Sequence, residues 1–255
     1  MSLRGFQTAL GRLVRARTAT DSTRRDLDPL DGLDLTLDER GRVARLADSP
    51  GFQFTVGVQR SWCEGRAASA AHLALSIFPV EQRRQIVNEW VSTGGGTAPL
   101  VASEAEAFLE FIARRLPEPS HALTLCRMEQ AVYRASEAAA KFMPTELSML
   151  DEPEAVLCAS GHAAIVRFFA EPQRLLAAVN EGLPLPLLSE PPYPMLFAPG
   201  LPGLFRPAGS DEVALWEKLS RPVTMRALLD GHYASKTIEA LVAVGAAVYG
   251  ATINS

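Results

Sequence analysis

The chain has few of the residues from which proteins build metal centres, disulfides or membrane spans. Its 255 residues include three cysteines and four histidines, and none of them lie at the spacing of a metal-ligand motif or a disulfide framework. No apolar run approaches the roughly 18–20 residues that a membrane-spanning helix needs. Arginines interrupt the N-terminal stretch where a signal peptide would have its apolar segment. We therefore expect a cytoplasmic protein that binds no metal or other cofactor of its own.

Positive charge is also scarce. The 25 lysines and arginines are outnumbered by 29 aspartates and glutamates, which gives a net charge of −4. A stand-alone DNA-binding protein usually presents a basic face, because neutralisation of phosphates supplies much of its affinity. The composition therefore argues against a nucleic acid as the partner.

Catalytic motifs are missing as well. Gly94-Gly95-Gly96-Thr97 is followed by Ala98-Pro99 and not by the lysine and helix of a phosphate-binding loop. The chain has no Gly-x-Ser-x-Gly elbow. Cys126 and Cys158 fall in an expected helix and an expected strand, where burial is the ordinary role of a thiol. We predict no catalytic residue and no metal ligand in this chain.

The first 150 residues carry amphipathic helical patterns. Apolar residues recur at helical spacing between turn-forming residues, which predicts a helical bundle domain over residues 1–150. The expected helices include Ser2–Arg17, Glu39–Ala47, Gln53–Ile77 and Glu81–Ser92. Another begins at a capping box at Ser103 and ends before Pro117, and the last begins after Ser120 and runs to about Phe142.

Two charged residues of this bundle fall on apolar helix faces. Arg66 continues the stripe of Val58 and Trp62, and Glu129 continues the stripe of Leu125. An unpaired charge on a core face would cost several kcal/mol, in order of magnitude. We predict that Arg66 and Glu129 form a structural ion pair in or near the core.

The character of the sequence changes after residue 150. Glu154–Cys158 and Ala163–Phe169 predict two strands around a turn at Ser160-Gly161, and a helix is expected from Pro172 to Gly182. Five prolines follow between residues 183 and 194, which favours a border between a connecting segment, 151–189, and a last domain, 190–255.

Residues 190–255 predict a hairpin packed on three short helices. The elements are strands Tyr193–Ala198 and Gly203–Arg206, helices Glu212–Leu219 (capped by Ser210), Pro222–Asp230 and Ser235–Val244, and a final strand Ala246–Tyr249. This arrangement is winged-helix-like. The expected fold class of the whole chain is mainly α with small β elements, α+β.

Three functions fit this scaffold. A transcriptional regulator would read DNA with Ser235–Val244, but Lys236 is the one cation of that helix. A self-contained enzyme would need the catalytic set that the chain lacks. A peptide-recognition module needs an open strand edge and an apolar groove, to which an extended peptide adds as a strand. This third function is favoured, and its expected peptide-binding residues are Met195, Leu196, Phe197, Ala198, Leu204, Phe205, Arg206, Ile238 and Leu241.

The C-terminal two-fifths also resembles known families. Met195–Gly200, Leu204–Pro207, Glu212–Leu219 and Thr224–Gly231 resemble the precursor-peptide recognition elements of ribosomal peptide-modifying systems. Gly161–Phe168 with Pro172–Leu176 is similar to the partner subunits of multinuclear non-haem iron oxidative enzymes, as used in methanobactin and 3-thiaglutamate biosynthesis. The N-terminal bundle, including Trp62–Arg66 and Cys126–Gln130, matches that family in general character alone.

The resemblance implies a subunit of an enzyme complex. The partner would be a barrel-type enzyme that holds the iron and oxidises a cysteine of the precursor peptide, in a heterodimer with this chain. This chain would bind the leader region of the peptide and hold its cysteine-bearing end at the partner's iron site. The bundle would then supply the surface that docks on the enzyme.

Overall fold

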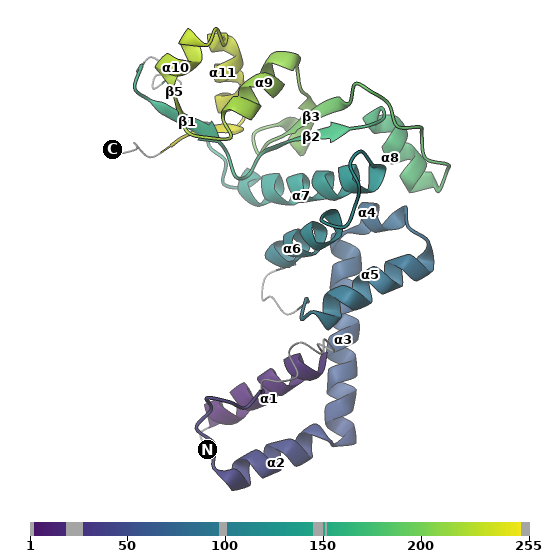
Figure 1. Cartoon of the computed structure of the whole chain (residues 1–255). Helices are drawn as coiled ribbons and strands as arrows, with labels where there is room; N and C mark the ends of the chain where they lie inside the picture. Colours follow the sequence, from purple (N-terminus) through teal and green to yellow (C-terminus); the bar gives the residue numbers. More distant parts are fainter. Residues whose placement is uncertain (1–2, 19–27, 97–100, 145–149, 151, 251–255) are drawn as a thin grey trace. The chain divides into compact units, whose positions relative to one another are not determined.

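The computed structural model describes residues 3–18, 28–96, 101–144, 150 and 152–250 (Figure 1). The chain forms two compact units, residues 1–114 and 115–255. The first unit is helical, and the second combines helices with two small antiparallel sheets, so the chain is α+β with a mainly helical N-terminal part, as predicted. None of the helices described is both long enough and apolar enough to cross a membrane.

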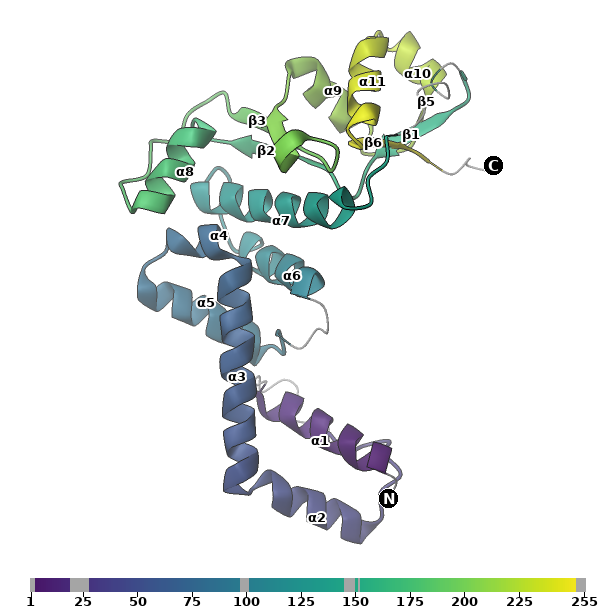
Figure 2. The same cartoon turned by 180° about the vertical axis from the view of Figure 1, so that it is seen from behind.

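The first unit is organised on one long helix, α3. Its helices are α1 (Leu3–Thr18), α2 (Leu37–Ala47), α3 (Pro50–Ala70), α4 (His72–Ser76), α5 (Val80–Ser92) and α6 (Val101–Ala113). Helices α1 and α2 lie on one side of α3, as Figure 2 shows, and share a small core with its first turns around Ala9, Val43 and Phe52. Helices α5 and α6 also pack on α3.

Two details of this unit differ from the sequence-based expectation. The helix expected over residues 53–77 is divided at Ala71, whose φ of −120° and ψ of 40° are not helical. Helix α6 begins at Val101, so Ser103 lies inside the helix and is not its cap. Glu104, the next residue, is buried, and its carboxylate is paired with Arg66.

The second unit alternates helices with short strands. Its elements are α7 (His121–Ala139), β1 (Val156–Ala159), β2 (Ala164–Phe168), α8 (Pro172–Glu181), β3 (Tyr193–Phe197), the 3-10 turn η3 (Pro202–Leu204), β4 (Phe205–Pro207), α9 (Ser210–Lys218), β5 (Val223–Thr224), α10 (Met225–Asp230), α11 (Ser235–Ala243) and β6 (Ala247–Tyr249). The borders predicted at 150/151 and 189/190 both fall inside this unit.

The strands form two separate antiparallel sheets. Strand order is β5-β1-β6 in one and β2-β3-β4 in the other. The two strands expected around Ser160-Gly161 are present as β1 and β2, but they belong to different sheets and do not pair with each other. The hairpin of β3 and β4 is confirmed, with Phe197 opposite Phe205.

Two helix starts were also wrong. The N-cap of α9 is Gly209 and not Ser210, because the Glu212 carboxylate reaches back to accept the Gly209 N–H at 2.9 Å. The helix expected from Pro222 begins at Met225, because Val223 and Thr224 pair with β1 and the Thr224 hydroxyl caps α10 by accepting the Ala227 N–H. Gly203 and Leu204, which were expected in a strand, belong to the 3-10 turn η3, and β4 begins at Phe205. The other predicted helices and strands are present.

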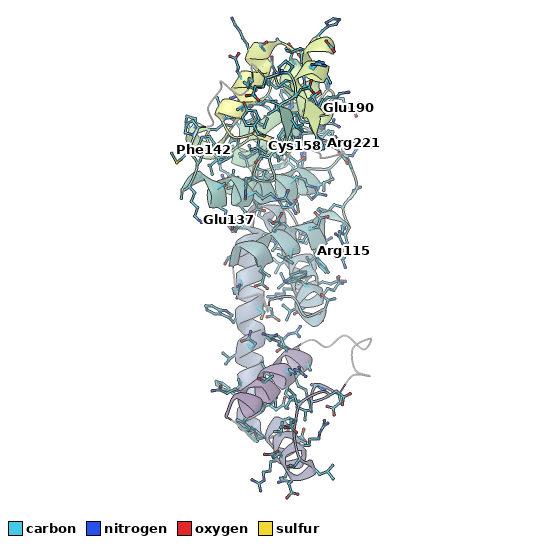
Figure 3. All side chains as sticks on the ribbon, turned by 90° about the vertical axis from the view of Figure 1, so that its left-hand side faces the viewer. Arg115, Glu137, Phe142, Cys158, Glu190 and Arg221 are labelled. Atoms are coloured by element: carbon cyan, nitrogen blue, oxygen red, sulfur yellow. The ribbon has the colours of Figure 1, made fainter. Side chains whose placement is uncertain are left out.

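Helices cover both faces of the β2-β3-β4 sheet. Figure 1 shows α7 running beneath β2 and β3, with α9 on the other side. Residues of β2 alternate between these faces: Ile165 packs against the core cluster of the C-terminal helices, which includes Leu215 of α9, and Val166 and Phe168 are buried on the opposite face. Phe142, labelled in Figure 3, follows α7 and fills the space beside Gly200 and Gly245, where a Cβ atom would meet its ring.

Candidate functional site

The β2-β3-β4 sheet has two edges, and β3 is on neither of them. In an antiparallel sheet, the backbone groups of successive residues point to alternate sides of the strand. Ala198 donates its N–H to Leu204 and Ala208 donates to Pro194, so the even-numbered residues of β3 bond to β4. Its odd-numbered residues therefore bond to β2, where Met195 is opposite Val166. Both sides of β3 are occupied, and a peptide strand has nowhere to add there.

The outer edge of β4 is short and poor in donors. The strand has three residues, and Phe205 and Pro207 are the two whose backbone groups point outward. Proline has no N–H to donate, and the Pro207 carbonyl already accepts a hydrogen bond from Arg206 Nη1 at 2.9 Å. Proline at an edge position is a common means of preventing strand addition.

An ion pair holds β4 in place. Arg206 binds Glu212 of α9 through both Nη atoms, at 2.8 and 2.5 Å. The hydrogen bond from Arg206 holds the pKa of the Glu212 carboxyl below its usual value, against the opposing effect of burial, and the same bond raises the pKa of Arg206. Arg206 therefore has a structural task in the hairpin that the sequence did not reveal.

The outer edge of β2 is open. Ala164, Val166 and Phe168 stand opposite the β3 residues that bond toward β2, so Ile165 and Arg167 direct their backbone groups outward. Within the described residues, the Ile165 N–H and C=O and the Arg167 N–H have no backbone partner. The Arg167 carbonyl accepts a hydrogen bond from the Thr124 hydroxyl of α7 at 3.2 Å. Three unpaired backbone groups thus face outward along one strand.

A groove of about 410 Å³ runs along this edge between α7 and α9. One wall is α7, with Leu123, Thr124 and Ala131 among its residues, and the other is α9, with Val213 and Trp216. Both walls combine apolar side chains with a few polar groups, which is the usual composition of a binding cleft.

Arginines dominate the charge of the groove. Arg127 and Arg134 come from α7 and Arg167 from β2, against the carboxylates of Glu118 and Glu217. Arg167 and Glu217 form an ion pair at 2.6 Å that links β2 to α9, and both side chains are more than half exposed. Exposed pairs contribute little, about 0–1 kcal/mol, so this pair opens at small cost.

The structure distributes the predicted peptide-binding residues between the core and the surface. Met195, Leu196, Phe197 and Ala198 of the hairpin are buried, as are Ile238 and Leu241 of α11, which have no exposed area. These six belong to the packed core in this structure.

The hairpin residues after the turn are more accessible. Leu204 is half-buried, Arg206 is held by Glu212, and the Phe205 ring is 46% exposed beside Phe197. That this chain binds a peptide at the hairpin stays a prediction; β2 is the strand that lies beside β3. The sequence did not indicate β2 as the open edge, because strand order is a property of the tertiary fold.

Arg66 has an acidic partner in its own unit. Its guanidinium lies 2.6 Å from Glu104 of α6, with side-chain exposures of 18% and 5%. Burial raises the pKa of the Glu104 carboxyl, and the charge of Arg66 opposes that shift. Glu129 is buried in the second unit, and a contact between it and Arg66 stays a prediction. The spacing of Glu104 from the apolar residues of α6 was the signal that could have identified it.

The thiols and histidines show no clustering. In the part of the chain that the structure describes, no three His, Cys, Asp or Glu side chains gather as the ligands of a metal would. Cys63 and Cys126 are buried, and burial raises the pKa of the Cys63 thiol. Cys158 of β1, labelled in Figure 3, is half-buried.

No protein-family model matches the chain, and no curated protein matches it. A role for the chain is therefore argued from the geometry described above.

Proposed function

We propose that this chain binds the leader region of a ribosomally made precursor peptide as a fourth strand on the outer edge of β2. The bound peptide would present a cysteine to an iron-dependent oxidative enzyme that pairs with this chain. One observation carries the proposal: the unpaired backbone groups of Ile165 and Arg167 open into a groove between two helices. Strand addition to an exposed sheet edge is an established mode of peptide recognition.

The groove supports both affinity and selectivity. An added strand would receive hydrogen bonds from the outward N–H groups and donate to the Ile165 carbonyl, which fixes the peptide backbone whatever its sequence. Alternate side chains of that strand would face α7 and α9 in turn. Trp216 offers apolar contact on the α9 side, and Leu123 and Ala131 offer it on the α7 side.

The order of elements in the second unit also supports the proposal. The hairpin (β3, β4) is followed by the three short helices α9, α10 and α11, with strand β5 between α9 and α10 and strand β6 after α11. This is the winged-helix-like order of the precursor-peptide recognition elements that the sequence resembles. Two further strands accompany this order: β2 lies beside the hairpin, and β5 pairs with β1.

In the proposed complex this chain would contribute position and not chemistry. A tethered peptide meets the partner's iron site at a high effective concentration, so an encounter becomes an intramolecular step. The iron would belong to the partner enzyme, and the complex would be cytoplasmic. The helical first unit would be the surface that docks on the enzyme.

The open edge can be tested without knowing the natural peptide. Random peptides of roughly 12 residues, which exceed the five residues of β2, are displayed and selected on the immobilised chain. The affinity of an enriched peptide is then measured by calorimetry for three proteins: the parent chain, Ile165→Pro and Phe205→Pro. Each substitution removes one outward N–H, the first on β2 and the second on β4, and neither N–H belongs to the ladder with β3.

We expect Ile165→Pro to weaken binding about 5- to 150-fold, because an unmet hydrogen bond in a buried site costs about 1–3 kcal/mol. Phe205→Pro should destabilise the hairpin, because the φ of Phe205 is −148° and proline requires about −65°, but its affinity for the peptide should equal that of the parent chain. Val213→Arg, which places a long side chain in the α9 wall, should also weaken binding. Equal affinities for all variants would refute the β2 placement, and loss with Phe205→Pro alone would return the site to β4. Circular dichroism checks that each variant is folded.

The partner enzyme is a separate test. Co-expression of the chain with a multinuclear iron oxidative enzyme from the same source should give a co-purifying pair whose modification of a cysteine-containing peptide is lost with Ile165→Pro. If the pair modifies the peptide equally well when this chain carries Ile165→Pro, the outer edge of β2 is not needed for the modification, and the proposed role of the groove is refuted.

A further inference from the structure

Thr124 of α7 makes the two open positions of the β2 edge unequal. Ile165 directs its N–H and its C=O outward, and neither has a backbone partner among the residues that the structure describes. Arg167 also directs both groups outward, but its carbonyl already accepts a hydrogen bond from the Thr124 hydroxyl at 3.2 Å. An added strand therefore meets an unsatisfied acceptor at Ile165 and a satisfied one at Arg167.

The Thr124 hydroxyl has no task at the start of its own helix. Helix α7 is capped by Ser120, whose hydroxyl accepts the Leu123 N–H at 3.2 Å. The backbone N–H of Thr124 continues the helix by donating to the Ser120 carbonyl at 3.1 Å. Thr124 is 2% exposed, and a buried hydroxyl needs a hydrogen-bond partner. The Arg167 carbonyl is the partner that the fold gives to it.

The pairing rules of a sheet show what this means for a bound peptide. The β2-β3-β4 sheet is antiparallel, and antiparallel pairing is slightly more stable per residue than parallel pairing. In an antiparallel peptide, the residue opposite Ile165 exchanges two hydrogen bonds with it. The residue opposite Arg167 lies two places nearer the peptide's N-terminus. Its C=O accepts the Arg167 N–H, but its own N–H meets a carbonyl that Thr124 already satisfies.

These two peptide N–H groups should therefore contribute unequally to affinity. When the peptide covers the edge and displaces water, the Ile165 carbonyl depends on the peptide for a donor, whereas the Arg167 carbonyl keeps Thr124. A carbonyl oxygen has two lone pairs and can accept a second hydrogen bond. That second bond contributes less than a bond to an acceptor that would otherwise be buried without a partner.

We infer that Thr124 is a specificity-determining residue that ends the hydrogen-bond ladder at Arg167, a role that rests on the proposed function. The ligand is then a peptide that lies antiparallel to β2 and needs one backbone N–H, the one opposite Ile165. Opposite Arg167, the site accepts a residue whose backbone nitrogen has no hydrogen to donate. The hydrogen-bonded part of the peptide is short, so the groove walls supply much of the selectivity.

The test replaces single N–H groups of a selected peptide by an ester oxygen, which removes the donor without adding bulk. Calorimetry with the parent chain should find one position, k, at which the ester weakens binding about fivefold, the effect of one lost hydrogen bond. The ester two residues nearer the N-terminus, k−2, should leave the affinity within about twofold of the unmodified peptide. The N–H of residue k−1 points away from β2, so k−1 is the control position.

Thr124→Val removes the hydroxyl and nearly keeps the shape of the side chain. In this variant the Arg167 carbonyl needs the peptide N–H, so the ester at k−2 should now also weaken binding about fivefold. The effects at k and k−1 should stay as in the parent chain. Thr124→Ser keeps the hydroxyl and should restore the tolerance at k−2. A merely structural role of Thr124 would change the affinity of all the peptides together, and circular dichroism checks that each variant is folded.

The outcomes separate this role from the proposed function. If Ile165→Pro weakens binding but the ester at k−2 has the same effect in the parent chain and in Thr124→Val, the role of Thr124 is overturned and the open edge of β2 stands. A new effect two residues after k, instead of before it, shows a parallel peptide and overturns the antiparallel arrangement. If Ile165→Pro binds like the parent chain, the proposed function fails and the role of Thr124 fails with it.

Discussion

Replacing Glu212 by glutamine is expected to destabilise the second unit by about 2 kcal/mol at neutral pH. Glu212 receives both Nη atoms of Arg206, at 2.8 and 2.5 Å, and its side chain is 13% exposed. The same carboxylate accepts the Gly209 N–H at the start of α9. One side chain therefore joins β4 to α9 and caps the helix. Glutamine keeps its size and one acceptor oxygen but loses the charge.

The magnitude follows from the environment of the pair. Hydrogen bonds to a charged partner contribute about 1.5–3 kcal/mol, and breaking a fully buried pair costs about 3–5 kcal/mol. Arg206 is 35% exposed, so water partly solvates its guanidinium once the carboxylate is gone. This places the loss in the lower part of these ranges, about 2 kcal/mol, or roughly 6–8 °C in Tm for a unit of this size.

The effect should depend on pH in a defined direction. The pKa of Glu212 is lowered from its usual 4.5 in the folded state. A lowered carboxyl pKa contributes stability that is present above 4.5 and is lost as the pH falls through the folded-state pKa. The difference between the parent chain and Glu212→Gln should therefore be full at pH 7 and shrink as the pH falls below 4.5.

The assay is urea unfolding followed by the fluorescence of Trp216, which lies on α9. Replacing Trp62 and Trp90 by phenylalanine leaves Trp216 as the single tryptophan, because the chain has three. The matched control is Glu217→Gln on the same helix. Its partner is Arg167, and that pair is more than half exposed, so its loss should cost about 0–1 kcal/mol.

Two results would refute the reasoning. The first is a Glu212→Gln variant that is as stable as the Glu217→Gln control at pH 7. The second is a destabilisation that stays constant from pH 7 to pH 3, because it would show that lost packing, and not lost charge, is responsible.

Three further predictions concern burial. Arg66→Met should destabilise the first unit by about 3–5 kcal/mol in urea unfolding, since it leaves the Glu104 carboxylate buried. Glu104→Gln should gain stability relative to the parent chain as the pH rises above 4.5, because burial raises the pKa of the Glu104 carboxyl in the folded state. Cys158 should react with a maleimide before the two buried cysteines, as peptide mass spectrometry would show. Gly245→Ala should lower the free energy of unfolding by about 2–4 kcal/mol, because residue 245 has a φ of +71° and the new methyl group would meet the ring of Phe142. Thermal unfolding checks this, and an unchanged Tm would contradict it.

Local patterns were sufficient to identify most elements. The apolar periodicity of α3 and α7, the proline at the start of α8 and the glycine that ends it are signals carried by neighbouring residues, and the structure confirms these elements. The hairpin of β3 and β4 is equally local, since its strands are joined by a short turn. Helix starts were less secure, because a start also depends on tertiary pairing: Val223 and Thr224 pair with β1, so α10 begins at Met225 with Thr224 as its cap.

Long-range pairing could not be found in the same way. Strand β1 pairs with β5 and β6, more than 60 residues later in the chain, and β2 pairs with β3 and not with β1, the strand that precedes it. The alternation of polar and apolar residues shows which face of a strand is buried, but not which strand lies beside it. The predicted peptide site therefore fell on β3, whose two sides are both occupied.

The sequence by itself determined that this protein has a helical N-terminal part, a small hairpin among short helices, and no recognisable catalytic motif, because composition and local periodicity carry that information. The tertiary structure decided which strand edge is open and which charges are paired. An open edge is defined by the absence of a neighbour in space, and Ile165, Arg167 and the groove beside them come together only when β2, α7 and α9 are packed.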